Sequence, residues 1–196
     1  MVEYWFPTPI WYFDLDEIDN KKIVKYAIKL SKKNKGRVIS NYGGWQSGDF
    51  HLNDCENEEL LKLGEIVELK AREASVELGI KQNMQVFMSN FWLNLNQKDN
   101  SNIRHTHPTS FFSAAYYVQA PENCGKIVFE HPSSLINFWW TSFTDNNSYA
   151  THSNINYEPK AGRLIIFPSW LEHSVQPNAS DDVRISVAFN MDISLV

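Results

Sequence analysis

The hydrophobic and polar positions along this chain follow two different periods, and the change comes near residue 82. Before that point, apolar residues recur every three or four positions in two segments, which predicts helices over residues 17–35 and 56–78. The stronger apolar stripe consists of Leu60, Leu63, Val67, Ala71, Ala74 and Leu78. Gly79 follows this stripe directly and fits a helix end, because glycine readily adopts the left-handed conformation found there.

The first predicted helix has weaker boundaries and a strongly basic face. Asp16 or Asp19 can cap its start, and Gly36 fits its end. It carries seven lysines: Lys21, Lys22, Lys25, Lys29, Lys32, Lys33 and Lys35. We interpret them as a solvated outer face, with a surface for an anion or a partner as the alternative.

Short β-like runs separated by turn residues follow one another after residue 82. The predicted strands cover residues 84–96, 103–107, 111–120, 125–130, 135–143, 150–157, 163–167, 172–176 and 183–193. Helices first and strands afterwards are typical of an α+β protein, here mainly β, whose sheet packs on the helices. We expect a single domain over residues 1–196, with a helical N-terminal part over 1–82 and a β core over 83–193.

Composition narrows the class of protein further. The chain of 196 residues has 43% hydrophobic and 21% charged residues, and its net charge of -5 argues against general nucleic-acid binding. Cys55 and Cys124 match no disulfide scaffold or zinc motif, so we expect free thiols in a reducing compartment. No apolar run is long enough to span a membrane, and the first residues do not resemble a signal peptide. These features predict a cytoplasmic protein; they do not predict its oligomeric state.

Two histidines stand two positions apart in the stretch IRHTHPTS. In a strand over residues 103–107, His105 and His107 project from the same side of the sheet. His173 lies far along the chain, at the start of another predicted strand. Three imidazoles on one side of a metal ion leave positions open opposite, as a catalytic redox metal requires.

Other polar residues can complete such a site. Arg184 begins the last predicted strand, and a hairpin with the short strand at His173 brings its guanidinium into the same cavity. Its forked donors suit bidentate binding of a carboxylate, and a hydroxyl such as that of Tyr117 could bind the other oxygen. Asn94 and Asn96 share one face of a half-buried run, and buried amides need partners, so we expect one to line the site.

A family resemblance rests on the order and spacing of several segments. They read "FPTPIW", "HTHPTS", "AAYYV", "CGKIVFEHP" and "HSVQP" followed by "RISVAF". These segments resemble the prolyl-hydroxylase-like branch of the 2-oxoglutarate- and iron(II)-dependent dioxygenases, and within it a group of small oxygenases of unassigned substrate. The resemblance implies a double-stranded β-helix, or jelly roll, with the N-terminal helices packed on one sheet.

The resemblance also implies the cofactors and the chemistry. The expected metal ligands for Fe(II) are His105, His107 and His173, and Arg184 and Tyr117 are expected to bind 2-oxoglutarate. Of the two buried amides, we expect Asn96 to bind the cofactor as well. The expected activity uses O2 to hydroxylate an unidentified small molecule or protein side chain, with decarboxylation of 2-oxoglutarate to succinate. Loops 38–54 and 131–150 are expected to form the mouth of the pocket.

One ligand departs from the family pattern. His107 stands where the family usually has a carboxylate, so three neutral ligands would leave the full charge on the metal. Glu130, Glu172 or Asp99 could supply a carboxylate instead. Two other functions therefore stay open: a three-histidine metal dioxygenase that does not use 2-oxoglutarate, and a non-catalytic jelly-roll binding protein.

Overall fold

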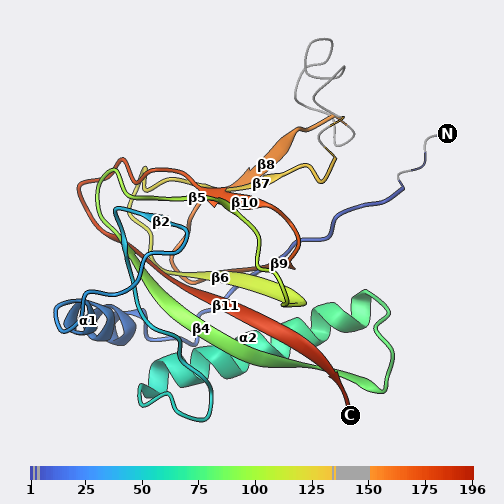
Figure 1. The fold of residues 1–196 in the computed structure, drawn as a ribbon, viewed down its shortest axis with the longest axis horizontal. Helices are drawn as coiled ribbons and strands as arrows, with labels where there is room; N and C mark the ends of the chain where they lie inside the picture. The colour runs from blue at the N-terminus through green and yellow to red at the C-terminus, as the bar shows by residue number, and fades with distance from the viewer. Residues whose placement is uncertain (2, 4, 134, 136–150) are drawn as a thin grey trace.

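Two antiparallel sheets lie one above the other, and two helices cover the outer face of the larger sheet (Figure 1). The computed structural model describes residues 1, 3, 5–133, 135 and 151–196. The larger sheet has the strand order β1-β9-β6-β11-β4-β3, and the smaller has β2-β5-β10-β7-β8. The strands are β1 Trp11–Asp14, β2 Asn41–Tyr42, β3 Trp45–Gln46, β4 Met84–Asn96, β5 Ser101–His105, β6 Phe112–Gln119, β7 Ile127–Glu130, β8 Asn154–Tyr157, β9 Arg163–Pro168, β10 His173–Val175 and β11 Arg184–Leu195.

This arrangement is the expected jelly roll, and the prediction of a mainly β, α+β fold is confirmed. The main hydrophobic core lies between the helices and the larger sheet, and a smaller cluster lies between the two sheets. The smaller cluster consists of Tyr117, Ile127, Phe129, Ile165, Phe167 and Leu171. The space between the sheets is therefore only partly filled by apolar side chains, which leaves room there for polar ones.

The longer helix follows the sequence pattern closely. Helix α2, Glu58–Glu77, begins where the Asn57 side chain accepts a hydrogen bond from the Leu60 amide. Gly79 follows the helix with a φ of 70°. The predicted apolar stripe is buried as far as Ala74, but Leu78 is 41% exposed, because the helix ends before it can pack on the sheet.

The shorter helix ends earlier than predicted. Helix α1, Asn20–Ser31, is capped by Asp19 rather than Asp16. The helix stops before Gly36, so the prediction that this glycine terminates it is wrong. The chain turns earlier instead, because the amides of Lys33 and Asn34 both donate to the Leu30 carbonyl. Neither α1 nor α2, the helices of the described residues, is long and apolar enough to cross a membrane.

The strand predictions differ from the structure at two places. The segment 38–54 is not a plain loop, since β2 and β3 pair there with β5 and β4. Strands of two residues are too short to show an alternating pattern, which explains why the sequence did not predict them. The predicted strand at 135–143 lies, apart from its first residue, outside the described residues. Strand β1 forms one edge of the larger sheet.

The second difference concerns His107. Strand β5 ends at His105, so His107 lies beyond the strand that was expected to carry both histidines. The backbone amide of His107 donates to the Ser169 carbonyl at 3.0 Å rather than to a neighbouring strand. Pro108 follows without an N–H group of its own, which disfavours continued pairing. Strand alternation therefore does not explain where the His107 side chain points.

Candidate active site

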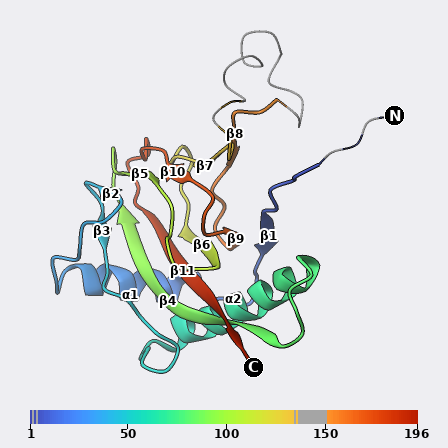
Figure 2. The same ribbon diagram turned by 45° about the vertical axis from the view of Figure 1, so that its right-hand side comes forward.

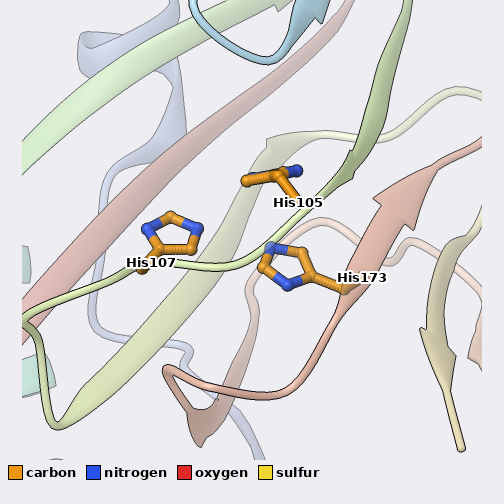
Figure 3. Close-up of side chains that lie close together, drawn as sticks. All are labelled: His105, His107 and His173. Carbon is orange, nitrogen blue, oxygen red and sulfur yellow. The ribbon is translucent and has the colours of Figure 1, made fainter.

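Three imidazole rings converge between the sheets (Figure 3). His105 ends β5, His107 lies in the following segment, and His173 begins β10. One ligand nitrogen from each ring lies within 4.8 Å of the others, and the ring centroids are 4.4 to 5.2 Å apart. His105 and His173 are paired in the β5–β10 ladder, so the sheet itself brings two of the rings together.

Backbone carbonyls orient two of these rings. Nδ1 of His105 lies 2.7 Å from the Ile103 carbonyl oxygen, and Nδ1 of His173 lies 2.9 Å from the Leu171 carbonyl oxygen. A carbonyl only accepts, so Nδ1 carries the proton in each neutral ring. Nε2 of each ring then has a lone pair for a metal ion, which is a common way of orienting metal-binding histidines.

Burial keeps all three rings neutral. Loss of solvation lowers the pKa of His105, lowers the pKa of His107 to about 4 and lowers that of His173 to about 3. The approach of the rings to one another adds to this effect for His107 and His173. At neutral pH the group therefore offers lone pairs rather than positive charges, which is the state that binds a metal.

A buried arginine lies in the same space between the sheets. Arg184 is 1% exposed, and its Nη1 donates to the carbonyl oxygens of Cys124, Gly125 and Gln176. Its Nη2 is buried and has no hydrogen-bond partner among the described residues. A buried donor without a partner is costly, so this atom is suited to a ligand that accepts hydrogen bonds.

Gly125 makes this placement of the arginine possible. A Cβ atom at this position would lie 2.9 Å from Nη1 of Arg184 and 2.4 Å from the Gln176 carbonyl oxygen. The φ of Gly125 is 85°, which other residues rarely adopt. The glycine turn in "CGKIVFEHP" therefore has a function in the site: it allows three carbonyls to approach one guanidinium nitrogen.

A narrow cavity connects the histidines with the arginine. Its lining includes the three histidines, Arg184 and side chains from both sheets, among them Trp92, Asn94, Asn96, Tyr117, Phe167 and Ser186. Its volume is about 50 Å³, which is small for a dicarboxylate, so side chains must move when such a ligand binds. Loop 38–54 contributes Ser40 to this lining, as expected of a pocket mouth.

The two adjacent tyrosines of β6, Tyr116 and Tyr117, point in opposite directions, because successive residues of a strand alternate between its faces. Tyr116 lies in the main core, and its hydroxyl donates to Oδ1 of Asn20 at 2.9 Å. Tyr117 lines the cavity near Arg184, and burial raises the pKa of its hydroxyl well above the usual range. Tyr117 thus brings a neutral phenol to the lining of the cavity.

Asn94 and Asn96 of β4 both line the cavity. Asn96, which was assigned to cofactor binding, lies opposite Arg184 in the β4–β11 ladder. Asn94 lies opposite Ser186, and its Oδ1 is buried with no partner in the described part of the chain. Sequence reasoning did not single out Trp92 or Ser186, although each lies two positions from a chosen residue and so shares its face.

The proposed carboxylate substitutes are engaged elsewhere. Arg104 forms ion pairs with Glu130 at 2.8 Å and Glu172 at 3.6 Å. Asp99 lies in a turn with a φ of 67°. The metal-binding group found among the described residues contains the three histidines and no carboxylate.

A second, larger cleft of about 610 Å³ lies between the N-terminal segment and the β7–β8 pair. Phe129 and Leu171 line it, and the Phe129 ring also packs against His173 with centroids 5.9 Å apart. His131 and Pro132 contribute to the lining. Most of the expected mouth loop 131–150, namely residues 134 and 136–150, lies outside the described residues.

Comparisons with known proteins agree on one family. A family model described as "Putative 2OG-Fe(II) oxygenase" matches residues 90–190. A search of curated protein sequences gave no match. A prolyl-4-hydroxylase from Pseudomonas putida has a similar structure, with a TM-score of 0.61 and 12% identity over 94% of this chain and 93% of that chain.

Two further solved structures are similar. A viral collagen prolyl hydroxylase from Paramecium Bursaria Chlorella virus-1, in a 2-oxoglutarate complex, has a TM-score of 0.58 and 16% identity over 93% of this chain and 94% of that chain. HygX from Streptomyces hygroscopicus, with nickel and 2-oxoglutarate bound, has a TM-score of 0.63 and 10% identity over 94% of this chain and 83% of that chain. At these identities, the likeness concerns the fold.

The family match carries more weight than the structural likeness. It spans 101 of the 196 residues, and its range includes the three histidines, Tyr117 and Arg184. The chain therefore belongs to the 2OG-Fe(II) oxygenases, non-haem iron enzymes whose cofactors are iron(II) and 2-oxoglutarate.

Proposed function

We propose that this protein hydroxylates a small molecule or a protein side chain, with conversion of 2-oxoglutarate and O2 to succinate and CO2. One observation carries the proposal. The converging histidines line the same cavity as Arg184, whose Nη2 has no hydrogen-bond partner in the described part of the chain. Three imidazoles that can hold a metal and an arginine whose N–H groups can bind an anionic oxygen thus line the same space. 2-Oxoglutarate needs both, because one end binds the metal and the other end is a carboxylate.

The three histidines would hold the iron. Their neutral state and the orientation of His105 and His173 by backbone carbonyls fit a divalent metal that prefers imidazole. Bound iron(II), with 2-oxoglutarate and O2, supplies the oxidising chemistry that replaces a substrate C–H bond by C–OH. His107 takes the place of the usual carboxylate, so the site has one negative charge fewer than the family pattern.

Arg184 would bind the carboxylate of 2-oxoglutarate that is remote from the iron. Nη1 is anchored by three carbonyls, which fixes the direction of Nη2, and none of the described residues accepts a hydrogen bond from Nη2. A preorganised donor loses little entropy on binding, so the interaction is stronger than that of a mobile lysine. Tyr117 and Asn96 line the cavity close to this guanidinium and would donate to the same carboxylate.

The test is an anaerobic titration of 2-oxoglutarate into iron(II)-loaded protein, followed in the visible range. Chelation of iron by 2-oxoglutarate is expected to produce a metal-to-ligand charge-transfer band. The band should weaken in Arg184→Ala, because the far end of the ligand loses its ionic partner. Arg104→Ala is the matched control. Arg104 lies in β5 next to His105, but its guanidinium forms ion pairs with Glu130 and Glu172.

The titration also separates the alternative functions. Bound iron without a band in the wild-type protein would contradict 2-oxoglutarate binding and favour a three-histidine dioxygenase that does not use it. Failure to bind iron at all would favour a binding protein without redox chemistry. A band accompanied by succinate formation after O2 is admitted supports the proposal, and substrate candidates can then be ranked by how much they increase succinate release.

A further inference from the structure

The indole of Trp92 stacks against the imidazole of His107. The two ring planes are within 20° of each other, and their centroids are 5.7 Å apart. The plane of His107 is in turn within 11° of that of His173, with centroids 5.2 Å apart, and Figure 3 shows these two histidines. Aromatic pairs at such distances stabilise each other beyond the effect of burial alone. The orientation of His107 therefore depends on where the indole lies.

Two side chains hold the indole of Trp92 in place. Gln46, with its amide oxygen turned toward the donors, accepts from Nε1 of Trp92 at 3.3 Å and from Nε of Arg37 at 3.1 Å. The guanidinium of Arg37 also lies over the indole, 5.7 Å from the ring centroid, as in a cation–π contact. Trp92 and Gln46 are both buried. An indole held at its N–H and at its ring in this way has little freedom to turn.

Asp49 fixes the arginine in turn. Nη1 of Arg37 donates to Oδ2 of Asp49 at 2.8 Å, and Nη2 donates to the other oxygen of the same carboxylate, which makes the pair bidentate. The Asn90 side chain donates to Oδ1 of Asp49 at 2.9 Å. A continuous series of contacts thus extends from Asp49, in the segment 38–54, through Arg37 and Trp92 to a histidine of the metal-binding group.

An aromatic neighbour suits a histidine at position 107 better than a carboxylate. The face of an indole carries negative potential, so it repels a carboxylate and attracts an electron-poor ring. A metal ion bound to His107 would withdraw electron density from the imidazole and strengthen this attraction. Backbone carbonyls at 2.7 and 2.9 Å orient the rings of His105 and His173. Trp92 gives His107 an orienting contact of another kind.

We propose that Trp92 is the positioning residue that orients His107 for metal binding, and that Gln46 and Arg37 hold its indole in place. The proposal rests on the proposed function for the identity of the metal. It concerns the orientation of the His107 ring, which can be measured without any metal. The departure from the usual carboxylate at position 107 thus has a matching aromatic partner in β4.

Three tryptophan variants test this role in a cobalt(II) titration without 2-oxoglutarate. Trp92→Leu removes the ring, Trp92→Phe keeps a ring, and Trp11→Leu is the matched control. Trp11 packs on Phe112 with centroids 5.6 Å apart, in the main core on the helix side of the larger sheet. We expect Trp92→Leu to bind cobalt(II) about 3- to 10-fold more weakly, and the other two variants to stay within about twofold of wild type. Wild-type affinity in Trp92→Leu, or an equal loss in Trp92→Phe or Trp11→Leu, would overturn the proposal.

Nuclear magnetic resonance of the metal-free protein gives a readout that does not depend on metal binding. Nuclear Overhauser contacts between the ring protons of His107 and His173 should weaken in Trp92→Leu and persist in Trp92→Phe. Those between His105 and His173, whose centroids are 4.4 Å apart, are the internal reference. Unchanged contacts in Trp92→Leu would contradict the proposal even in a protein that binds no metal, which separates its failure from that of the proposed function.

A variant of Gln46 keeps the test possible if Trp92→Leu does not fold. Gln46→Met has a side chain of similar length and removes the oxygen that accepts from the indole N–H. The Overhauser contacts between His107 and His173 should weaken in this variant as well, because the indole is then free to turn. Contacts of wild-type intensity in Gln46→Met would contradict the proposal.

Discussion

Arg184 and Asn96 lie directly opposite each other in the β4–β11 ladder, and both side chains line the cavity that contains the histidines. Cross-strand partners share one face of a sheet, so these two residues form the end of the cavity as a pair. Moving along the same ladder, Ser186 faces Asn94, and Ala188 faces Trp92, whose ring stacks on His107 with centroids 5.7 Å apart. Three successive cross-strand pairs of β4 and β11 therefore form a continuous surface from Arg184 to the histidines.

Arg184→Lys should separate the anchoring of this residue from its binding of 2-oxoglutarate. A lysine ammonium cannot both satisfy the three carbonyls and present a second nitrogen to a carboxylate. We expect the KM for 2-oxoglutarate to rise about 10- to 100-fold, equivalent to the loss of one charge-assisted hydrogen bond. Cobalt(II) affinity should stay unchanged. Steady-state kinetics and metal titration check this, and an unaltered KM would contradict the assignment.

Metal binding should stabilise the folded protein through the three histidines. At a metal concentration 100 times Kd, linkage predicts about 2.7 kcal/mol, which raises the Tm of a chain of this length by about 5–10 °C. His173→Ala should abolish the rise in a nickel(II) melting experiment. His51→Ala is the matched control, because His51 interacts with the Ser89 carbonyl away from the cavity. A full rise in His173→Ala would show that the metal binds elsewhere.

Tyr116 and Tyr117 offer a matched pair of hydroxyl deletions. Tyr116→Phe removes a buried hydrogen bond to Asn20 and should lower the free energy of unfolding by about 1 kcal/mol without changing the KM for 2-oxoglutarate. Tyr117→Phe should raise the KM for 2-oxoglutarate, because Tyr117 lines the cavity. Urea unfolding and steady-state kinetics of both variants decide the matter. The roles are misassigned if Tyr116→Phe changes the KM and Tyr117→Phe does not.

The edge strand β1 should loosen at low pH. Arg163 and Lys160 bind Asp14 at 2.8 and 2.7 Å, and the hydrogen bond from Arg163 is the main cause that lowers the pKa of Asp14. A lowered folded-state pKa gives stability that is present above pH ~4 and lost as the pH falls below it. Because the Asp14 side chain is 38% exposed, solvent screening limits this to within about 1 kcal/mol. Asp14→Asn should therefore be less stable than wild type at pH 7 and approach it near pH 2, as measured by urea unfolding.

The fold was largely predictable because its elements carry local signals. The α2 stripe from Leu60 to Ala74 and the long alternating strands β4 and β11 can each be recognised from their own residues. The boundaries that failed depend on contacts across the chain. Helix α1 ends before Gly36, and β2 and β3 exist because β5 and β4 offer them pairing partners.

The sequence was enough to predict that the three histidines come together. It was not enough to predict which structural elements bring them together. His105, His107 and His173 do converge, but the strand alternation used to place His107 is wrong, since β5 ends before it. The Ser169 carbonyl, which accepts a hydrogen bond from the His107 amide, directly follows β9 and belongs to no motif that points to His107. Such a contact depends on two distant segments meeting, which no local pattern records.

The direct pairing of His105 with His173 has a consequence for folding kinetics. These residues come from distant parts of the chain, and β10 lies between β5 and β7 in the smaller sheet, as the view in Figure 2 also shows. Closing such a long loop is slow, so this ladder is expected to form late, after the transition state. A metal bound there would then slow unfolding and leave the folding rate nearly unchanged, so that iron would determine the lifetime of the native protein rather than the speed at which it is reached.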